Sequence, residues 1–98
     1  MPDRVSASAS VATSSPERYA KQLAAHLGRR LEVREEADGL RLVFGDGSGD
    51  CLLRAQDSAL ELHAAATDRA ELERITQVVG SHLERFGQRN ELSVVWQS

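Results

Sequence analysis

The sequence predicts a single α+β domain, spanning residues 1–98, in which an antiparallel sheet carries two helices on one face. Short runs that alternate apolar and polar residues are joined by tight turns, and two longer segments repeat apolar residues at helical spacing. Most of the short runs lie between the two helical segments instead of alternating with them, which favours a two-layer sandwich over a parallel sheet. The expected order is β-α-β-β-β-β-α-β, with residues 1–4 disordered.

Period-two alternation predicts the strands. In the first run, apolar residues from Val5 to Val11 alternate with serines; because Ala and Ser are weak strand formers, a disordered tail is the alternative. The turns are the dipeptides Asp38-Gly39 and Asp57-Ser58 and a Gly-rich loop at 45–50. We interpret this loop as a plain hairpin loop and not as a calcium or phosphate site. The expected strands lie at 5–11, 31–33, 40–44, 51–55, 60–64 and 92–96. The outer sheet face, turned to water or a partner, should carry Ser6, Ser8, Glu32, Arg41, Glu61 and His63.

Each helix begins at a capping sequence. Pro16 suits the first turn of the first helix, with Ser14 and Glu17 as a capping box and Gly28 as a left-handed cap after Leu27. In the second helix, Asp68 is the expected cap, Glu71 completes its capping box, and Gly87 ends the helix. The first apolar stripe is Tyr19, Leu23, His26, Leu27 and the stem of Arg30; the second is Leu72, Ile75, Val79, His82, Leu83 and Phe86.

Composition excludes several classes of function. The net charge is −3 and only one of the twelve basic residues is a lysine, which argues against broad contact with nucleic acid. We see neither a signal peptide nor a membrane-spanning run, so we expect a cytoplasmic protein with no membrane contact. Cys51, the single cysteine, cannot form an internal disulfide, and we interpret it as a structural thiol.

Two histidines occupy equivalent places near the ends of the two helices. Tyr19, Leu23, His26 and Leu27 have the same spacing as Ile75, Val79, His82 and Leu83. If the helices lie side by side, the two rings approach each other, and with a carboxylate such as Glu84 they could ligate a metal. Glu84 falls far from the stripe, however, and the favoured interpretation is that each ring sits at the core edge and bonds to a backbone carbonyl.

Arg85 borders the second stripe near His82. Together with Tyr19 and Arg30 it could line a pocket for an anionic ligand, because the guanidinium fork suits such groups. The alternative is that Arg85 covers the core edge with its stem. The candidate ligand-binding residues are therefore Tyr19, His26, Arg30, His82 and Arg85; we assign no catalytic residue, no metal ligand and no cofactor.

Two segments carry a resemblance to a known family. They are the stretch 15–23 followed by His26, and the stretch 81–86 followed by Arg89, Glu91, Leu92 and Trp96. This pattern resembles a bacterial family of unknown function, made of short stand-alone proteins that also occur joined to siderophore-interacting flavin reductases. The resemblance implies a link to iron handling but assigns no functional residue. The chain departs from the family after His26, where Leu27-Gly28 replaces a bulkier aromatic and a second basic position.

Three hypotheses follow. The leading one is a non-enzymatic accessory or ligand-binding domain linked to ferric-siderophore metabolism, with a siderophore or other small-molecule ligand and a flavin reductase as candidate partners. The second is a small metal-binding protein or enzyme that uses His26 and His82. The third is a structural module that forms a homodimer through its outer sheet face or an edge strand.

Overall fold

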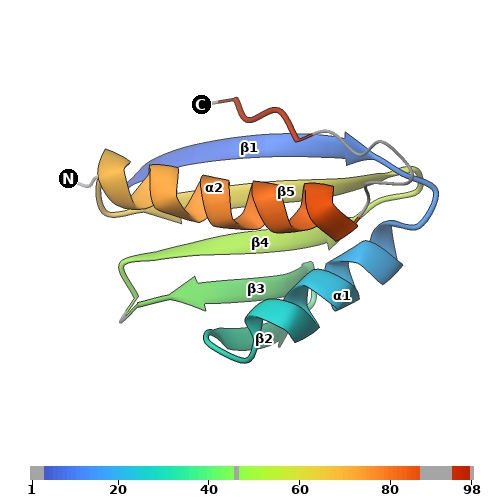
Figure 1. The fold of residues 1–98 in the computed structure, drawn as a ribbon, viewed down its shortest axis with the longest axis horizontal. Helices are drawn as coiled ribbons and strands as arrows, with labels where there is room; N and C mark the ends of the chain where they lie inside the picture. Colours follow the sequence, from blue (N-terminus) through green and yellow to red (C-terminus); the bar gives the residue numbers. More distant parts are fainter. Residues whose placement is uncertain (1–3, 46, 87–93, 98) are drawn as a thin grey trace.

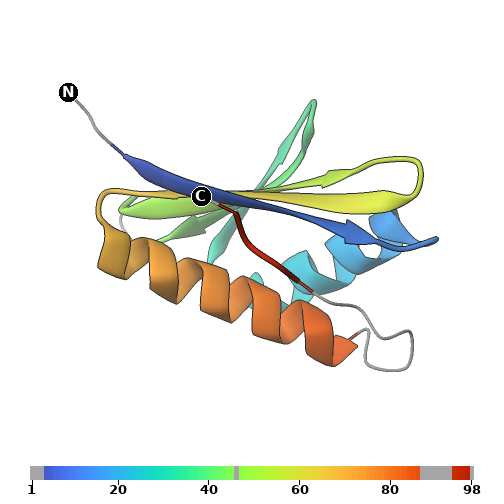
Figure 2. The same cartoon turned by 90° about the horizontal axis from the view of Figure 1, so that it is seen from above.

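The computed structural model describes residues 4–45, 47–86 and 94–97, and places their strands and helices in two layers. Along the chain the elements are β1 (Val5–Ala12), α1 (Pro16–Leu27), β2 (Glu32–Glu36), β3 (Gly39–Phe44), β4 (Gly49–Ala55), β5 (Ala59–Ala66) and α2 (Arg69–Phe86). The strands form one sheet in the order β1-β5-β4-β3-β2, and every neighbouring pair is antiparallel. Both helices cover the same face of this sheet (Figures 1 and 2). The predicted fold class is confirmed.

The strand order decides what α1 must do. Because β1 and β2 lie at opposite edges of the sheet, α1 carries the chain from one edge to the other across the covered face (Figure 1). The chain then returns through β2, β3, β4 and β5 as a meander, and β5 pairs with β1. This closure places α2, which follows β5, beside β1 and β5, whereas α1 lies toward the β2–β3 hairpin (Figure 1).

The core lies between the helices and the covered face of the sheet. The alternation of β1 places its apolar residues inward, and the register pairs them with the apolar positions of β5: Ala7 with Ala64, Ala9 with Leu62 and Val11 with Leu60. Large side chains of both helices complete the core without measurable exposure: Leu23 of α1, and Ile75, Val79 and Leu83 of α2. The strand prediction for 5–11 is thus confirmed against the alternative of a disordered tail. Arg4 of the predicted disordered segment forms an ion pair with Asp50, and residues 1–3 lie outside the described residues.

Two of the predicted turns, Asp38-Gly39 and the loop at 45–50, differ in position from the prediction. The turn before β3 is Ala37-Asp38, and Gly39 is already the first residue of β3, opposite Glu36. Strand β4 begins at Gly49, inside the segment that we predicted to be loop. Gly49 lies under α2, where an added Cβ would sit 2.3 Å from Cδ1 of Ile75, so the missing side chain is what lets the helix approach the strand.

The helix ends differ in part from the predicted caps. The prediction that Ser14 caps α1 in a capping box with Glu17 is wrong, because Ser15 is the residue before the helix and its side chain forms no capping hydrogen bond. The Ser15 N–H instead donates to Oγ1 of Thr13 at 3.1 Å. The prediction of a left-handed Gly28 is wrong, because Gly28 continues the right-handed helical backbone with φ −63°. The Asp68 cap of α2 is confirmed, since its Oδ1 accepts from the Glu71 N–H at 2.8 Å. The predicted stop at Gly87 lies outside the described residues.

The predicted last strand is reduced to one point of pairing in the part of the chain that the structure describes. Ser8 of β1 and Gln97 exchange two backbone hydrogen bonds of 2.7 Å, which form an isolated antiparallel bridge. Val94 and Trp96 pack against the core, while Val95 is 67% exposed, as the alternation predicts. Leu92 lies outside the described residues. Neither α1 nor α2 is long and apolar enough to cross a membrane.

Candidate functional site: a histidine pair and an acidic cleft

The structure brings His26 and His82 together. Their ring centroids lie 5.0 Å apart with the ring planes tilted by 45°, and Phe86 meets the His26 ring edge-on at 5.4 Å. His26 lies in the last turn of α1 and His82 lies four residues before the described end of α2, so the side-by-side arrangement expected from the equivalent spacing is confirmed. His26 is exposed and His82 is half-buried, which places the pair at the rim of the core.

One ring has a fixed hydrogen-bonding partner. Nδ1 of His82 lies 2.7 Å from the backbone oxygen of Val78, one turn earlier in α2. Since a carbonyl oxygen can only accept, Nδ1 carries the proton and donates it, and Nε2 of the neutral ring keeps its lone pair. The interpretation of a core-edge ring bound to a backbone carbonyl thus holds for His82. Glu84 is exposed, and its Oε2 instead accepts from the Val94 N–H at 2.9 Å.

The three other predicted site residues differ in their exposure. Tyr19 is 7% exposed and belongs to the core, whereas the side chains of Arg30 and Arg85 are exposed. The cavities described below are lined by none of the five predicted ligand-binding residues. Whether those residues bind a ligand therefore stays a prediction.

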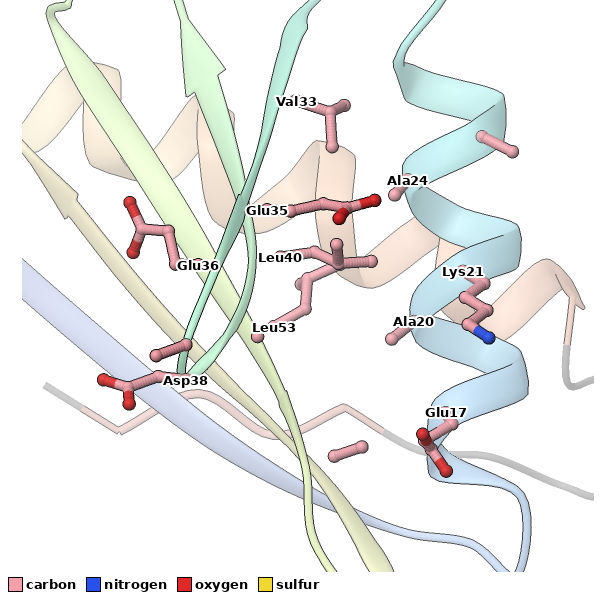
Figure 3. Close-up of a pocket in the computed structure, with 14 residues that line it drawn as sticks. Glu17, Ala20, Lys21, Ala24, Val33, Glu35, Glu36, Asp38, Leu40 and Leu53 are labelled. Carbon is pink, nitrogen blue, oxygen red and sulfur yellow. The ribbon is translucent and has the colours of Figure 1, made fainter.

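A cleft lies on the other side of α1. It has a volume of about 780 Å³ and separates α1 from the β2–β3 hairpin (Figure 3). Its apolar floor is formed by small residues of α1 and by larger side chains of the strands, namely Ala20, Ala24, Val33, Leu40 and Leu53. Such a volume falls within the ordinary range of small-molecule sites, which is roughly 300–1,000 Å³.

Carboxylates surround this floor. Glu17 of α1 lies at the mouth, and Glu35 of β2 points across the cleft toward Ala24, while Glu36 and Asp38 turn away from α1 (Figure 3). Lys21 is the basic residue of the lining. Within the described ranges, neither Glu17 nor Glu35 forms an ion pair. The acidic residues of the lining outnumber Lys21, so the cleft presents net negative charge beside an apolar surface.

The sequence did not lead us to expect this cleft, although one residue, Glu35, indicates it. Glu35 occupies the same face of β2 as Val33 and lies opposite Leu40, so it is a charged residue at a position whose neighbours are apolar. A carboxylate on the helix-facing side of a strand is costly to bury unless it meets water, a partner or a ligand. The alternation of Leu31 and Val33 continues to Glu35, and the charge of Glu35 breaks the apolar pattern.

The outer face of the sheet is polar, as predicted. Arg41 holds Glu36 at 2.9 Å and Asp50 at 3.0 Å, and Asp50 also accepts from Arg4 at 3.2 Å. The hydrogen bond from Arg41 lowers the pKa of Glu36, and the same bond raises the pKa of Arg41. His63 lies on this face, 3.3 Å from Glu61, and therefore on the opposite side of the sheet from His26 and His82. Arg4, Arg41, Asp50 and His63 border a hollow of about 520 Å³, in which both arginines pair with Asp50.

Cys51 offers no reactive thiol. It is fully buried in β4 on the helix-facing side, and burial raises the pKa of its thiol to about 12. Because the thiolate is the nucleophile, a thiol held this far from ionisation is inert at neutral pH. This agrees with the interpretation of Cys51 as a structural residue.

Comparison with known proteins adds a family but no activity. The solution NMR structure of PA4090 from Pseudomonas aeruginosa is similar to this chain, with a TM-score of 0.76, 27% identity and 94% of each chain covered. No curated protein matches the sequence. The family model for an uncharacterised protein conserved in bacteria, DUF2218, matches residues 8–97. This match spans both helices, strands β2 to β5 and β1 from Ser8, and the chain therefore belongs to the DUF2218 family of uncharacterised bacterial proteins.

Proposed function

We propose that this chain is a non-enzymatic ligand-binding domain, and that its ligand is a small amphipathic molecule of neutral or positive charge held between α1 and the β2–β3 hairpin. The observation that carries the proposal is the cleft of about 780 Å³ with an apolar floor and the unpaired carboxylates of Glu17 and Glu35. Binding sites for small molecules commonly combine an apolar lining with a few placed polar groups.

The charge of the cleft sets the preferred ligand. Two carboxylates without ion-pair partners among the described residues attract a cation, and Leu40 and Leu53 offer surface for an apolar portion of the same molecule. At about 4 Å in a solvated site, each unit charge pair is worth about 1 kcal/mol, which is roughly fivefold in affinity. For a polyanionic ligand, each pair of like charges is repulsive by about the same free energy.

The link to iron enters through the resemblance to proteins joined to siderophore-interacting flavin reductases. We propose a ferric siderophore of the neutral or cationic hydroxamate class as the first ligand to test. A ferric catecholate complex, in which three doubly ionised catechols surround Fe³⁺, carries net negative charge and is the mismatched ligand. In this proposal the domain presents its ligand to a separate flavin reductase in the cytoplasm and has no catalytic residue of its own.

The test is an NMR titration of the ¹⁵N-labelled chain with three probes. They are the Ga³⁺ complex of a cationic hydroxamate siderophore, the Ga³⁺ complex of a catecholate siderophore, and benzyltrimethylammonium. Ga³⁺ replaces Fe³⁺ because Fe³⁺ is paramagnetic. We expect the first and third to shift the amides of Val33, Leu40 and Leu53. Glu35→Gln should weaken binding about fivefold. Glu73→Gln, on the exposed side of α2, is the matched control and should leave affinity unchanged.

The outcomes separate the two parts of the proposal. Shifts with benzyltrimethylammonium alone keep the cleft as a site for organic cations and remove the link to siderophores. The cleft itself is ruled out if no probe shifts its amides at millimolar concentration, or if Glu35→Gln and Glu73→Gln bind equally well.

A further inference from the structure

We propose that His26 and His82 form a chelating site for one divalent transition-metal ion at the rim of the core. The site is separate from the acidic cleft, whose lining contains neither histidine. It draws its two ligands from different helices, so a bound ion would join the C-terminal ends of α1 and α2.

The distance between the rings fits a shared ion. Zinc–imidazole nitrogen bonds are about 2.0–2.1 Å, so an ion held by two rings at angles between square and tetrahedral separates their centroids by roughly 4.5–5 Å. The observed separation of 5.0 Å lies at the upper end of this range. The 45° tilt between the planes is also compatible with two rings that converge on one ion, since a stacked pair would have parallel planes.

The surroundings prepare His82 for ligation. The hydrogen bond from Nδ1 to the backbone oxygen of Val78, at 2.7 Å, fixes the ring and leaves the lone pair of Nε2 to ligate a metal ion. A histidine that ligates a metal commonly donates its other N–H in this way, which orients the ring and raises its basicity. Phe86, edge-on against the His26 ring at 5.4 Å, limits the motion of that second ligand.

The position at the helix ends also favours a cation. His26 lies in the last turn of α1, where the backbone dipole places partial negative charge, and His82 lies in the C-terminal half of α2. The charged groups nearest in sequence are Arg29, Arg30 and Arg85, which are exposed, and Glu84, whose carboxylate accepts from the Val94 N–H. Exposed guanidinium groups repel the ion only through screened solvent.

The site offers two protein ligands. Within residues 4–45, 47–86 and 94–97, no group of three or more His, Cys, Asp or Glu side chains gathers as a metal centre. The remaining coordination positions are therefore open to water or to a small donor molecule. Imidazole ligation favours Cu²⁺, Zn²⁺ and Ni²⁺, with Cu²⁺ the tightest, over the oxygen-seeking Mg²⁺.

The experiment is calorimetric titration of the untagged full chain with Zn²⁺, Ni²⁺ and Mg²⁺. The variants are His26→Gln, His82→Gln and, as the matched control, His63→Gln on the opposite side of the sheet. We expect one Zn²⁺ or Ni²⁺ per chain and none with Mg²⁺. Loss of either paired histidine should weaken binding about tenfold or more, because it leaves one ligand, while His63→Gln should change affinity less than twofold.

A second measurement needs no variant. In the unsubstituted chain, Zn²⁺ should shift the ring ¹H and ¹⁵N resonances of His26 and His82 together, and leave those of His63 in place. The proposal is overturned if the His63 ring shifts as far as the other two, if only one ring of the pair responds, or if His26→Gln and His82→Gln bind zinc as tightly as the unsubstituted chain. Because the probe is the metal alone, this result is independent of any ligand in the cleft.

Discussion

Trp96 crosses α2 at Gly80: a Cβ atom placed on Gly80 would lie 3.1 Å from Nε1 of the indole and 3.6 Å from Cγ1 of Val94. The C-terminal segment thus rests on the helix at its smallest residue. Its far end is held by the two hydrogen bonds between Ser8 and Gln97. A glycine within a long helix, which lowers helix propensity, is explained here by the side chains that pass over it.

Filling this contact should detach the C-terminal segment. Gly80→Leu forces a bulky side chain into the space of Trp96, and we expect a loss of stability of about 1–3 kcal/mol from overpacking, reduced by the higher helix propensity of leucine. Hydrogen exchange should accelerate at the Ser8 and Gln97 amides. Ala70→Leu, at an exposed position of α2, is the control and should leave both amides protected. Unchanged exchange in Gly80→Leu would contradict this account of the segment.

The contact between Gly49 and Ile75 should behave as an energetically coupled pair. Gly49→Ala places a Cβ 2.3 Å from Cδ1 of Ile75 and 2.9 Å from the backbone oxygen of Ala65, so we expect a loss of about 1–3 kcal/mol. Ile75→Val removes the clashing Cδ1 and alone costs about 0.5–1.5 kcal/mol. In urea unfolding, the double variant should be more stable than the sum of the single effects. Simple additivity would show that Cδ1 is not the obstacle.

Acid should weaken the hydrogen bonds that the Glu71 carboxylate accepts from its neighbours. Its carboxylate accepts from Ser48 at 3.0 Å and from Arg74 at 2.6 Å, and the bond from Arg74 is the main cause that lowers the pKa of Glu71 below 4.5. A lowered pKa means that the stabilisation is present above 4.5 and is lost as the pH falls through the lowered value.

Glu71→Gln should therefore be less stable than the unsubstituted chain at pH 7, with a gap that narrows below pH 4.5. Melting temperatures from pH 2 to 7 measure this gap. Glu73→Gln, whose carboxylate forms no ion pair with a described residue, should show no comparable narrowing. A gap for Glu71→Gln that stays constant with pH would refute the assignment.

Cys51 should report the opening of the core. With its thiol fully buried and its pKa raised to about 12, alkylation at pH 8 should be slower than in the denatured chain by a factor on the order of 10³ or more. Urea should restore the rate in parallel with the loss of circular dichroism. Rapid labelling of the folded chain would mean that β4 is accessible without unfolding.

The periodicity of apolar residues predicted the buried faces of the strands and helices. The alternation of Ala7, Ala9 and Val11 and the stripe of Ile75, Val79 and Leu83 each identify one apolar face, and these faces pack as predicted because burial of apolar surface dominates folding. The exact positions of the turns were harder to predict from the sequence. Gly39 and Gly49 were interpreted as turn and loop residues, yet both lie in strands, where the absence of a side chain permits close approach.

The candidate site was predictable only in part. The equal spacing of His26 and His82 on their stripes sufficed to expect their approach, because both stripes face one layer. The acidic cleft was not expected, since it depends on how far the β2–β3 hairpin stands from α1, a distance that no local pattern encodes. Tyr19 packs in the core, as its place on the apolar stripe predicts, and its role in binding a ligand stays a prediction.

The sheet order also decides how this domain can be joined to other molecules. Ser8 and Gln97 place the two ends of the described chain beside β1, while the cleft opens at β2, the opposite edge (Figures 1 and 3). A fluorescent tag, a biosensor tether or a fused enzyme attached at either end would therefore emerge on the side remote from the cleft. The architecture suits immobilisation with the cleft facing the solution.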